Sequence, residues 1–322
     1  MSHLESIKAN KEAFEKFVKE KEDHSFIKVL QYTVAYTLLT FDINSPRKDV
    51  SDTEEPVDGE LMVKKYEELP HGQFVGNLLR PDSKIIDFAC GTGAITEMLA
   101  PFIPQAEYVG IDISEDMLGK FDQTAGELKK KLPELKVNSI CGDVLADDFD
   151  DAALEGSADV VFSSLAFHHL HNYNVVAEKL KTFLKPGGHI VIIDMFSDPA
   201  KNHHSLLSKQ GHGNHHSHSH GHGHGHEEGQ GHGHGHSHGH EEPQLNDEAV
   251  KRGVSHHGIS NEEMISCLSS GCENVSSTRE HHVNLWFDKK MADPDGTRNL
   301  PSKDDLVLAP CGLIVGIAQK SA

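Results

Sequence analysis

A glycine-containing turn that follows an apolar stretch constrains the fold of this chain more than any other feature. Residues 85–93 read Ile-Ile-Asp-Phe-Ala-Cys-Gly-Thr-Gly, and a helical pattern begins at Ala94. In a doubly wound parallel sheet, the first strand ends in such a turn and brings the backbone close to a nucleoside-bearing ligand. Glycine suits this turn because a Cβ atom would hold the backbone away from the ligand. The segment therefore predicts an α/β fold with a ligand at the end of its first strand.

Strand and helix patterns alternate between Lys84 and Phe196. This alternation predicts parallel strands joined by right-handed crossovers. Ser114 is expected to cap a helix, because its hydroxyl can accept a backbone N–H of the first turn. The expected strands are 84–90, 107–113, 137–142, 159–164 and 189–196, followed after a gap by 275–287 and 313–319; the expected helices are 94–100, one after Ser114, 175–184 and 261–269, and residues 288–310 are expected to form a polar loop.

The chain divides into four segments by composition. Residues 1–60 are expected to form an N-terminal helical cap and an acidic loop, because apolar residues such as Phe14, Phe17 and Val18 recur at helical spacing and residues 42–59 contain acids and prolines. Residues 61–200 hold strands one to five, after a helix expected at 64–79 that ends before Pro81. Residues 201–244 are a histidine-rich, low-complexity insertion that we expect to be disordered, and residues 245–322 complete the core.

Charge and cysteine content exclude several classes of partner. The 322 residues include 50 acidic and 30 basic side chains, which give a formal net charge of −20 with histidine counted as neutral. Nucleic-acid backbones and anionic membranes would repel such a chain. No stretch reaches the ~18 apolar residues of a membrane helix, and the charged first residues do not resemble a secretory signal. The five cysteines match no disulfide framework, so we expect reduced thiols and a cytoplasmic or nuclear location.

Two cofactor classes compete for the glycine turn. A dinucleotide-binding turn has a third glycine for close helix–strand packing, and this chain has Thr96 there. Asp87 stands just before the turn, where a carboxylate would repel a pyrophosphate. The same carboxylate would attract the ammonium group of an amino acid. These residues therefore favour S-adenosylmethionine over a dinucleotide.

With these motifs the sequence resembles the class I S-adenosylmethionine-dependent methyltransferases, which have a Rossmann-like sheet. The resemblance covers residues 84–196 well and residues 253–285 loosely. It implies a seven-stranded sheet whose last strand runs antiparallel beside the fifth, and an N-terminal helical segment that covers the cofactor. The family often has glycine where Ala89 stands, so the backbone is less free here. The motifs that carry the resemblance are 87–93, 109–114, 141–144, 159–164 and 184–188.

The resemblance also implies roles for individual residues. Asp112 would accept hydrogen bonds from the two ribose hydroxyls, and Ile113 would pack on the adenine face. Asp143 would accept from the adenine amino group, and Val144 would offer a backbone amide to the ring. Either aspartate could instead cap the helix that follows it. The other implied cofactor-binding residues are Asp87, Ala89, Gly91, Gly93 and, along the methionine moiety, Ser164.

Two further stretches resemble a narrower group within this family. Residues 163–170 and 256–264 resemble small-molecule methyltransferases that include the ubiquinone and menaquinone biosynthesis enzymes. The expected function is S-adenosylmethionine-dependent methyl transfer to a small-molecule acceptor by in-line displacement. Residues 159–164 lack the Asn/Asp-Pro-Pro-Tyr/Phe motif that holds planar amino groups, which disfavours exocyclic base amines. The alternatives are a cofactor-binding protein without turnover, and a metal-binding (Ni or Zn) protein on a non-catalytic methyltransferase fold.

Several histidines are candidate general bases, although methyl transfer needs a base only where the nucleophile must lose a proton. His168 and His169 follow the fourth strand, and His256 and His257 precede the helix expected at 261–269. All four come from loops on the carboxyl side of the sheet, where open α/β sheets bind ligands. A pair such as His168 and His169 is more often one packed and one solvated residue than a catalytic group.

The insertion holds 15 of the 26 histidines, mostly in Gly-His or Ser-His pairs. Imidazole binds Zn and Ni, and a flexible chain can wrap such an ion without a fixed geometry. An expansion without function, or a pH-sensitive linker, would have the same composition. The candidate metal ligands are His222, His224, His226, His232, His234 and His236.

Overall fold

The computed structural model of the chain describes residues 3–19, 25–45, 48–50, 54–71, 76–198, 245, 250, 253–293, 296 and 298–322. The candidate metal ligands at 222–236 lie outside these residues. The elements in chain order are α1 (His3–Lys19), α2 (Ser25–Thr40), β1 (Val57–Asp58), α3 (Gly59–Glu67), β2 (Lys84–Phe88), α4 (Ala94–Leu99), β3 (Glu107–Asp112), α5 (Glu115–Lys131), β4 (Lys136–Cys141), β5 (Ala158–Ser164), η1 (Phe167–His169), α6 (Tyr173–Thr182), β6 (Leu184–Met195), α8 (Asn261–Ser269), β7 (Cys272–Asp288), α9 (Lys289–Ala292), β8 (Ser302–Lys303) and β9 (Leu306–Lys320).

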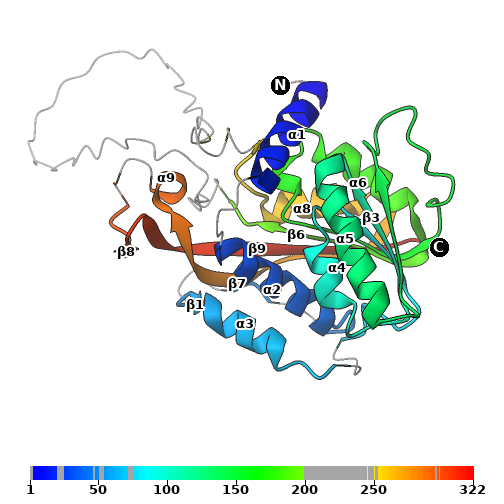
Figure 1. Cartoon of the computed structure of the whole chain (residues 1–322), viewed down its shortest axis with the longest axis horizontal. Coiled ribbons are helices and arrows are strands. Elements are labelled where there is room, and N and C mark those ends of the chain that lie inside the picture. Colours follow the sequence, from blue (N-terminus) through cyan, green and yellow to red (C-terminus); the bar gives the residue numbers. More distant parts are fainter. Residues whose placement is uncertain are drawn as a thin grey trace, which may run out of the picture.

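The strands of the described residues form one sheet in the order β1-β7-β9-β6-β5-β2-β3-β4, with β8 paired to β9. Strands β2 to β6 pair in parallel. Strand β9 runs antiparallel between β6 and β7, through the middle of the molecule (Figure 1). This topology confirms the predicted doubly wound sheet with an antiparallel last strand beside the fifth. The two-residue strands β1 and β8 add to the seven that were expected.

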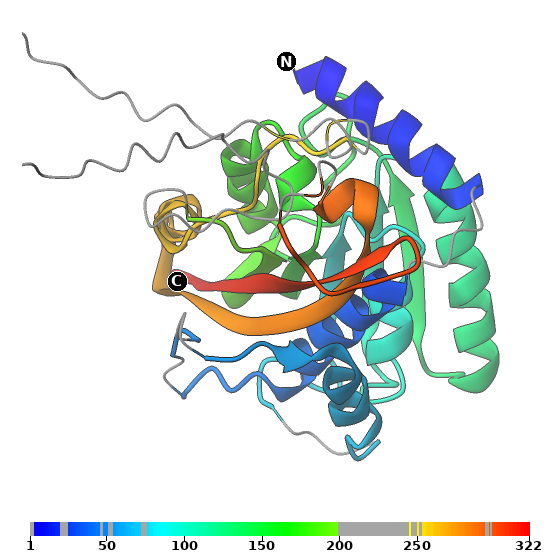
Figure 2. The ribbon, with the colours of Figure 1, turned by 90° about the vertical axis from the view of Figure 1, so that its left-hand side faces the viewer.

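Helices cover both faces of the sheet, because successive side chains of a buried strand point to opposite faces. Val191 and Ile193 of β6 pack in a cluster with side chains of α2, α4 and α5. Ile190 and Ile192 pack in a second cluster with side chains of α6 and α8. In Figure 2, α2 and α3 lie on one side of β7 and β9, and α8 lies on the other. None of the helices within the described residues is both long and apolar enough to span a membrane.

The helix expected at 64–79 is shorter and begins earlier. It is α3, which spans Gly59–Glu67 and is capped by the side chain of Asp58. The prediction was wrong because it took Pro81 as the end of the helix. Pro70 lies three residues after the observed end, and a proline disfavours helical conformation in the residue before it.

The polar loop expected at 288–310 instead contains α9, β8 and the start of β9. Strands β7 and β9 therefore form a hairpin that reaches beyond the parallel part of the sheet. Its apolar side chains Leu285, Phe287 and Val307 pack in a third buried cluster with Leu30 of α2 and Met62 of α3. Burial against helices from the start of the chain extends the strands, and local sequence patterns do not report such contacts.

Replacing the buried Lys181 of α6 by methionine is expected to lower the free energy of unfolding by about 2 kcal/mol. Its ammonium donates to Glu178 Oε1 (2.7 Å) and to the carbonyl oxygens of Cys267 (3.3 Å) and Ser270 (2.9 Å) at the end of α8. Without Lys181 these two carbonyls lose a charged donor. Urea unfolding followed by circular dichroism measures the change.

Lys179→Met is the matched control on the same helix. Lys179 pairs with Asp151 nearer the surface, and such pairs contribute at most about 1 kcal/mol. Equal losses for the two variants would contradict a role of Lys181 in fastening α8.

Candidate functional site

The candidate site lies at the carboxyl ends of β2 and β5. From β2 the chain proceeds to β3 and β4 on one side, then returns to β5 and β6 on the other. The connections that leave β2 and β5 therefore run to opposite sides of the sheet. Open α/β sheets bind ligands outside the strand ends at such a switch point. The residues predicted to bind the cofactor follow β2, β3, β4 and β5, so the fold brings them to one edge.

The turn after β2 is left-handed at three positions. Ala89, Gly91 and Gly93 have φ values of 57°, 53° and 84°. A Cβ added at Gly93 would lie 2.8 Å from the ring of Phe121, whereas one at Gly91 would meet nothing within 4 Å. Gly93 therefore allows the helix after the turn to pack, and Gly91 borders open space that a ligand can occupy. Ala89 adopts its conformation at a cost of about 1–2 kcal/mol.

Asp112, at the end of β3, fastens this turn. Its Oδ2 accepts the backbone N–H of Gly91 (2.9 Å) and its Oδ1 accepts that of Ser114 (2.9 Å). Ser114 in turn caps α5, its hydroxyl accepting the N–H of Met117. Asp112 therefore precedes the cap and is not itself the cap. Burial raises the pKa of Asp112, although the backbone hydrogen bonds from Ser114 and Gly91 oppose that shift. Each oxygen keeps a second lone pair for a ligand.

Asp143, just after β4, also holds a local turn, its Oδ1 accepting the N–H of Leu145 (3.0 Å). Its Oδ2 contacts Nε2 of His3, at the start of α1, at 2.8 Å. The adjacent Val144 is buried, and Ile113 after β3 and Ser164 at the end of β5 are half-buried. The structure thus gathers the implied adenine-binding residues at the edge and adds a histidine that sequence reasoning missed.

Asp87 differs in charge from the sequence-based expectation. It is 1% exposed in β2 and accepts a hydrogen bond from the Thr96 hydroxyl at 3.0 Å. Burial, assisted by the nearby Asp112, raises the pKa of Asp87 to about 8 despite that hydrogen bond. The carboxyl is therefore mostly protonated at pH 7 in the ligand-free protein, and the expected anionic pocket needs a cationic ligand to develop its charge.

Helix α1 lies across the same edge. Besides the contact of His3 with Asp143, its Asn10 donates to the carbonyl oxygen of His169 (3.0 Å), and its Ser6 hydroxyl lies 3.5 Å from that of Ser255. The helix therefore spans from the end of β4 to the segment after β5. Among the described residues, the buried apolar clusters include no side chain of α1. These polar contacts and the packing of Phe14 on the ring of His169 hold the helix in place, and elements with few buried apolar contacts open most readily.

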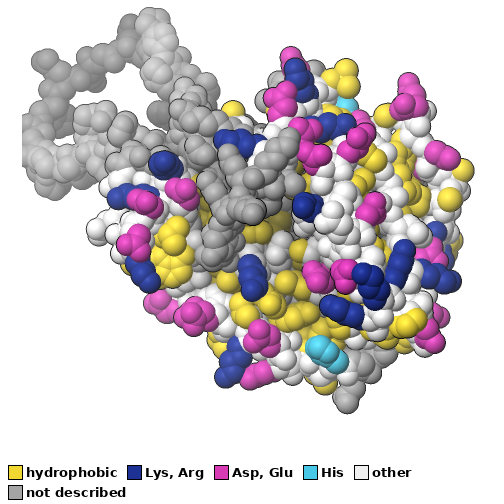
Figure 3. All heavy atoms as spheres, in the orientation of Figure 1, with side chains coloured by type: hydrophobic (Ala, Val, Ile, Leu, Met, Phe, Trp, Pro, Cys, Tyr) yellow, Lys and Arg dark blue, Asp and Glu magenta, His cyan; other side chains and the backbone are white. Residues whose placement is uncertain are grey.

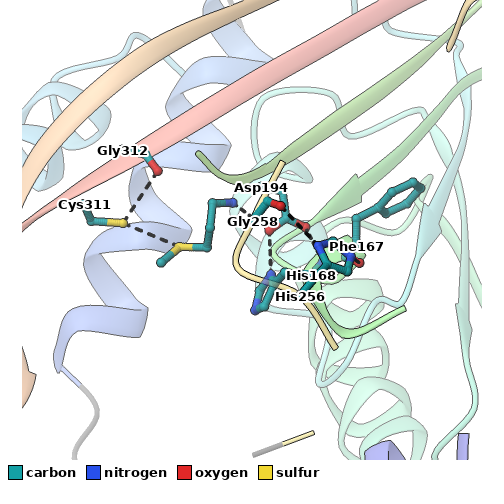
Figure 4. Close-up of polar contacts among 8 residues, drawn as sticks. Phe167, His168, Asp194, His256, Gly258, Cys311 and Gly312 are labelled. Carbon is teal, nitrogen blue, oxygen red and sulfur yellow. Dashed lines mark hydrogen bonds and ion pairs between the residues drawn. The ribbon is translucent and has the colours of Figure 1, made fainter. Parts of the chain in front are cut away.

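His168 forms a hydrogen-bonded pair with Asp194 (Figure 4). The distance from Nδ1 of His168 to Oδ1 of Asp194 is 2.5 Å, and the backbone N–H of His168 also donates to Oδ2 (3.2 Å). Asp194 is fully buried and accepts the backbone N–H of Met195 as well. Although burial alone would raise the pKa of Asp194, His168 and the Met195 amide hold it below its ordinary value. Asp194 is therefore a buried carboxylate.

His169 is packed and neutral. Its ring lies 4.1 Å from that of His168 and 5.0 Å from that of Phe14 in α1. Burial, together with the neighbouring His168, lowers the pKa of His169 to about 3. By exposed area His168 is the buried member of this pair and His169 is half-buried, so neither is the fully solvated residue that the sequence analysis considered common.

His256 fastens the segment before α8 to η1. Its Nε2 contacts the carbonyl oxygen of Phe167 (2.8 Å) and its Nδ1 that of Gly258 (3.1 Å). Burial lowers the pKa of His256, so the neutral ring carries one proton although each of its nitrogens faces a carbonyl oxygen. The shorter distance assigns that proton to Nε2. His257 is half-buried beside it.

Asp194, like His3, is a residue of this site that sequence reasoning missed. The available signal was an acid near the carboxyl end of an otherwise apolar strand, His-Ile-Val-Ile-Ile-Asp-Met. An ionisable side chain in such a strand is rare unless it is paired or functional. Its partner, however, comes from η1, 26 residues earlier, and only the fold shows that pairing.

Comparison with known proteins assigns the family. Residues 86–190 match the family model described as a methyltransferase domain. These residues include most of β2, strands β3 to β5 and the first half of β6, together with the turn, Asp87, Asp112 and Asp143. Residues 86–190 of this chain are a methyltransferase domain. S-adenosylmethionine is the cofactor of this family, and the comparison confirms the resemblance to class I methyltransferases.

Three relatives show how much of the chain is similar to known methyltransferases, and at what sequence identity. An uncharacterized methyltransferase of Schizosaccharomyces pombe is 26% identical over 290 residues, which cover 88% of this chain and 85% of that protein. A trans-aconitate 2-methyltransferase of Deinococcus radiodurans is 34% identical over 113 residues, 35% of this chain and 38% of that protein. A demethylmenaquinone methyltransferase of Thermus thermophilus is 31% identical over 130 residues, 40% and 54% of the two chains. The chain thus spans about half or less of the relatives that have named substrates.

The chemistry of the site fits S-adenosylmethionine. The open side of Gly91 leaves room beside the turn, and Asp112 can accept hydrogen bonds there. A cationic ligand beside Asp87 would favour its ionised form. No group of three or more His, Cys, Asp or Glu side chains within the described residues could hold a metal ion.

Proposed function

We propose that this methyltransferase transfers the methyl group of S-adenosylmethionine to a small-molecule acceptor at the carboxyl edge of β2 and β5. The observation that carries the proposal is the Asp112–Gly91 hydrogen bond, because it presents an acid and an open glycine turn together at the switch point. The bound cofactor supplies an activated methyl group on a sulfonium.

We assign the cofactor contacts residue by residue. Asp112 accepts from the ribose hydroxyls, while Ile113 and Val144 contact the adenine and Asp143 accepts from its amino group. Asp87 and Ser164 lie toward the methionine moiety, and the ammonium of that moiety favours the ionised form of Asp87. The protein holds acceptor and donor at attack distance, which can lower the barrier by about 7–11 kcal/mol. Helix α1, across this edge, keeps water from the reactants.

Charge and similarity support a small acceptor. The relatives include enzymes named for trans-aconitate and for demethylmenaquinone. The net charge of −20 opposes binding to nucleic acid. Figure 3 shows Lys and Arg side chains scattered among Asp and Glu on the face drawn there, which is unlike a basic track for a phosphate backbone.

Label transfer tests the proposal. The full chain is incubated with methyl-labelled S-adenosylmethionine and, separately, with the small-molecule fraction, the protein fraction and the RNA fraction of a cell extract. We expect label in a small-molecule product only. Transfer to protein or RNA alone would contradict the small acceptor.

Calorimetry with S-adenosylmethionine and with NAD tests the cofactor itself. We expect S-adenosylmethionine to bind and NAD to give no heat, because a pyrophosphate would meet the Asp112 carboxylate near the turn and would not stabilise the ionised form of Asp87. Binding of NAD without S-adenosylmethionine would contradict the assigned contacts.

A further inference from the structure

The pairing of His168 with Asp194 fixes which ring nitrogen carries the proton. An ionised carboxylate only accepts hydrogen bonds, and Asp194 is ionised. Nδ1 of His168, 2.5 Å from Asp194 Oδ1, is therefore the donor. In the neutral imidazole, Nε2 then has a lone pair and no proton. The backbone N–H of Met195, which donates to the same carboxylate at 2.6 Å, holds Asp194 in this orientation.

His168 is buried, and only a small part of its side chain is accessible. Ten per cent of the His168 side chain is exposed, whereas Asp194 is fully covered. Within the described residues Nδ1 has a hydrogen-bond partner and Nε2 has none. The preceding Phe167 packs its ring 6.5 Å from that of Phe88, the residue before Ala89 of the glycine turn. The η1 turn that holds His168 therefore lies beside the end of β2, and the hydrogen bond to Asp194 places the ring of His168 beside β6.

Three ionisable groups lie around His168. Asp194 of β6 is the facing anion. His169 of η1 has a pKa of about 3 because it is buried. His256, from the segment before α8, has a pKa lowered by burial and points Nε2 at the carbonyl of Phe167. Two neutral imidazoles and one carboxylate thus surround His168.

We propose that His168 is the general base of the methyl transfer, that Asp194 is its positioning residue, and that the acceptor attacks through a phenolic or enolic hydroxyl. This inference rests on the function proposed above. The hydroxyl proton moves to Nε2 of His168 as the oxygen forms its bond to the methyl carbon. The carbon–sulfur bond that breaks leaves its electron pair on sulfur. His168 then returns its proton to water, with Asp194 unchanged.

The His168–Asp194 pair indicates which class of acceptor the site takes. A carboxylate acceptor is ionised at neutral pH and needs no base. A phenol or enol is mostly protonated at that pH, and a positioned base accelerates its reaction by about 10²–10⁴-fold. A buried carboxylate–imidazole pair costs desolvation free energy, so its presence at this edge indicates an acceptor of the second class.

The test compares His168→Gln, Asp194→Asn and the control His171→Gln, which changes an exposed histidine three residues away. The acceptor is the small-molecule fraction methylated by the unaltered protein. We expect kcat to fall about 10²–10⁴-fold for His168→Gln, at least tenfold for Asp194→Asn, and not at all for His171→Gln. The dissociation constant of S-adenosylmethionine, measured by calorimetry, is expected to stay within about twofold for all three. The acid limb of the kcat–pH profile should disappear in His168→Gln.

Two further readouts separate catalysis from folding. In the ligand-free full chain, a far-downfield proton NMR signal from the short Nδ1–H···Oδ1 contact is expected, and it should vanish in both site variants but not in the control. Nitro-substituted phenols that are ionised at the assay pH should be methylated by His168→Gln almost as fast as by the unaltered protein. A variant damaged only in its fold would lose both kinds of acceptor equally, and that result would overturn the inference.

The outcomes also separate this inference from the proposed function. Methyl transfer by His168→Gln at the full rate would overturn the role of His168 and leave the proposed function standing. Absence of both S-adenosylmethionine binding and methyl transfer in the unaltered protein would overturn both. Activity confined to carboxylate acceptors would overturn the acceptor class proposed here.

Discussion

Asp112→Asn is expected to weaken S-adenosylmethionine binding by about 100-fold, as measured by calorimetry. The carboxylate is assigned two hydroxyl donors of the ribose, and hydrogen bonds to a charged acceptor contribute about 1.5–3 kcal/mol each. An asparagine at this position has one acceptor oxygen, which the N–H of Gly91 or Ser114 would occupy. Its NH₂ group would then face a second N–H donor, so the turn loses support as well.

Asp116→Asn is the matched control, because the same substitution lies one turn further along, in the exposed first turn of α5. It is expected to leave binding unchanged. Circular dichroism at low temperature checks that Asp112→Asn still folds. If the folded variant bound S-adenosylmethionine as tightly as the unaltered protein, Asp112 would not be the ribose acceptor, and its role would be limited to fastening the turn.

Asp87→Asn is expected to raise the free energy of unfolding at pH 8 by several kcal/mol. The folded protein holds the Asp87 proton with a pKa of about 8, against 3.8 for an ordinary aspartate. Because the folded state binds this proton more tightly, the contribution of Asp87 to stability is greatest at low pH. It falls by about 1.4 kcal/mol for each pH unit between about pH 4 and pH 8, then levels off. Asparagine keeps an acceptor for the Thr96 hydroxyl without this loss.

Urea unfolding from pH 5 to pH 9 checks this expectation. The gap in the free energy of unfolding between Asp87→Asn and the unaltered protein should widen with pH up to about 8. Asp82→Asn, at an exposed position five residues earlier, serves as the control and should show no widening gap. A constant gap at all pH values would mean that Asp87 is already ionised in the folded state. Saturating S-adenosylmethionine should narrow the gap, because its ammonium favours the ionised carboxyl.

Much of the fold could be predicted from periodicity and turns. The five parallel strands and the cap at Ser114 follow local patterns that burial and hydrogen bonding impose on short segments. The place of β9 followed from the family resemblance. The end of α3 was missed because Pro70, not Pro81, is the nearer helix breaker. The extension of β7 and β9 could not be predicted, since Leu285 and Phe287 are buried by residues more than 200 positions earlier.

The sequence by itself determined the methyltransferase family, the parallel core and which acids reach the ligand edge. These depend on spacing along the chain, because parallel strands bring their carboxyl ends to one edge whatever the details of packing. Only the tertiary structure decided the chemical state of the site: that burial raises the pKa of Asp87, that Asp194 is a buried carboxylate, and that His168 rather than His169 pairs with it. Protonation depends on burial and on partners brought from distant segments. The local sequence specifies neither the burial nor the partners.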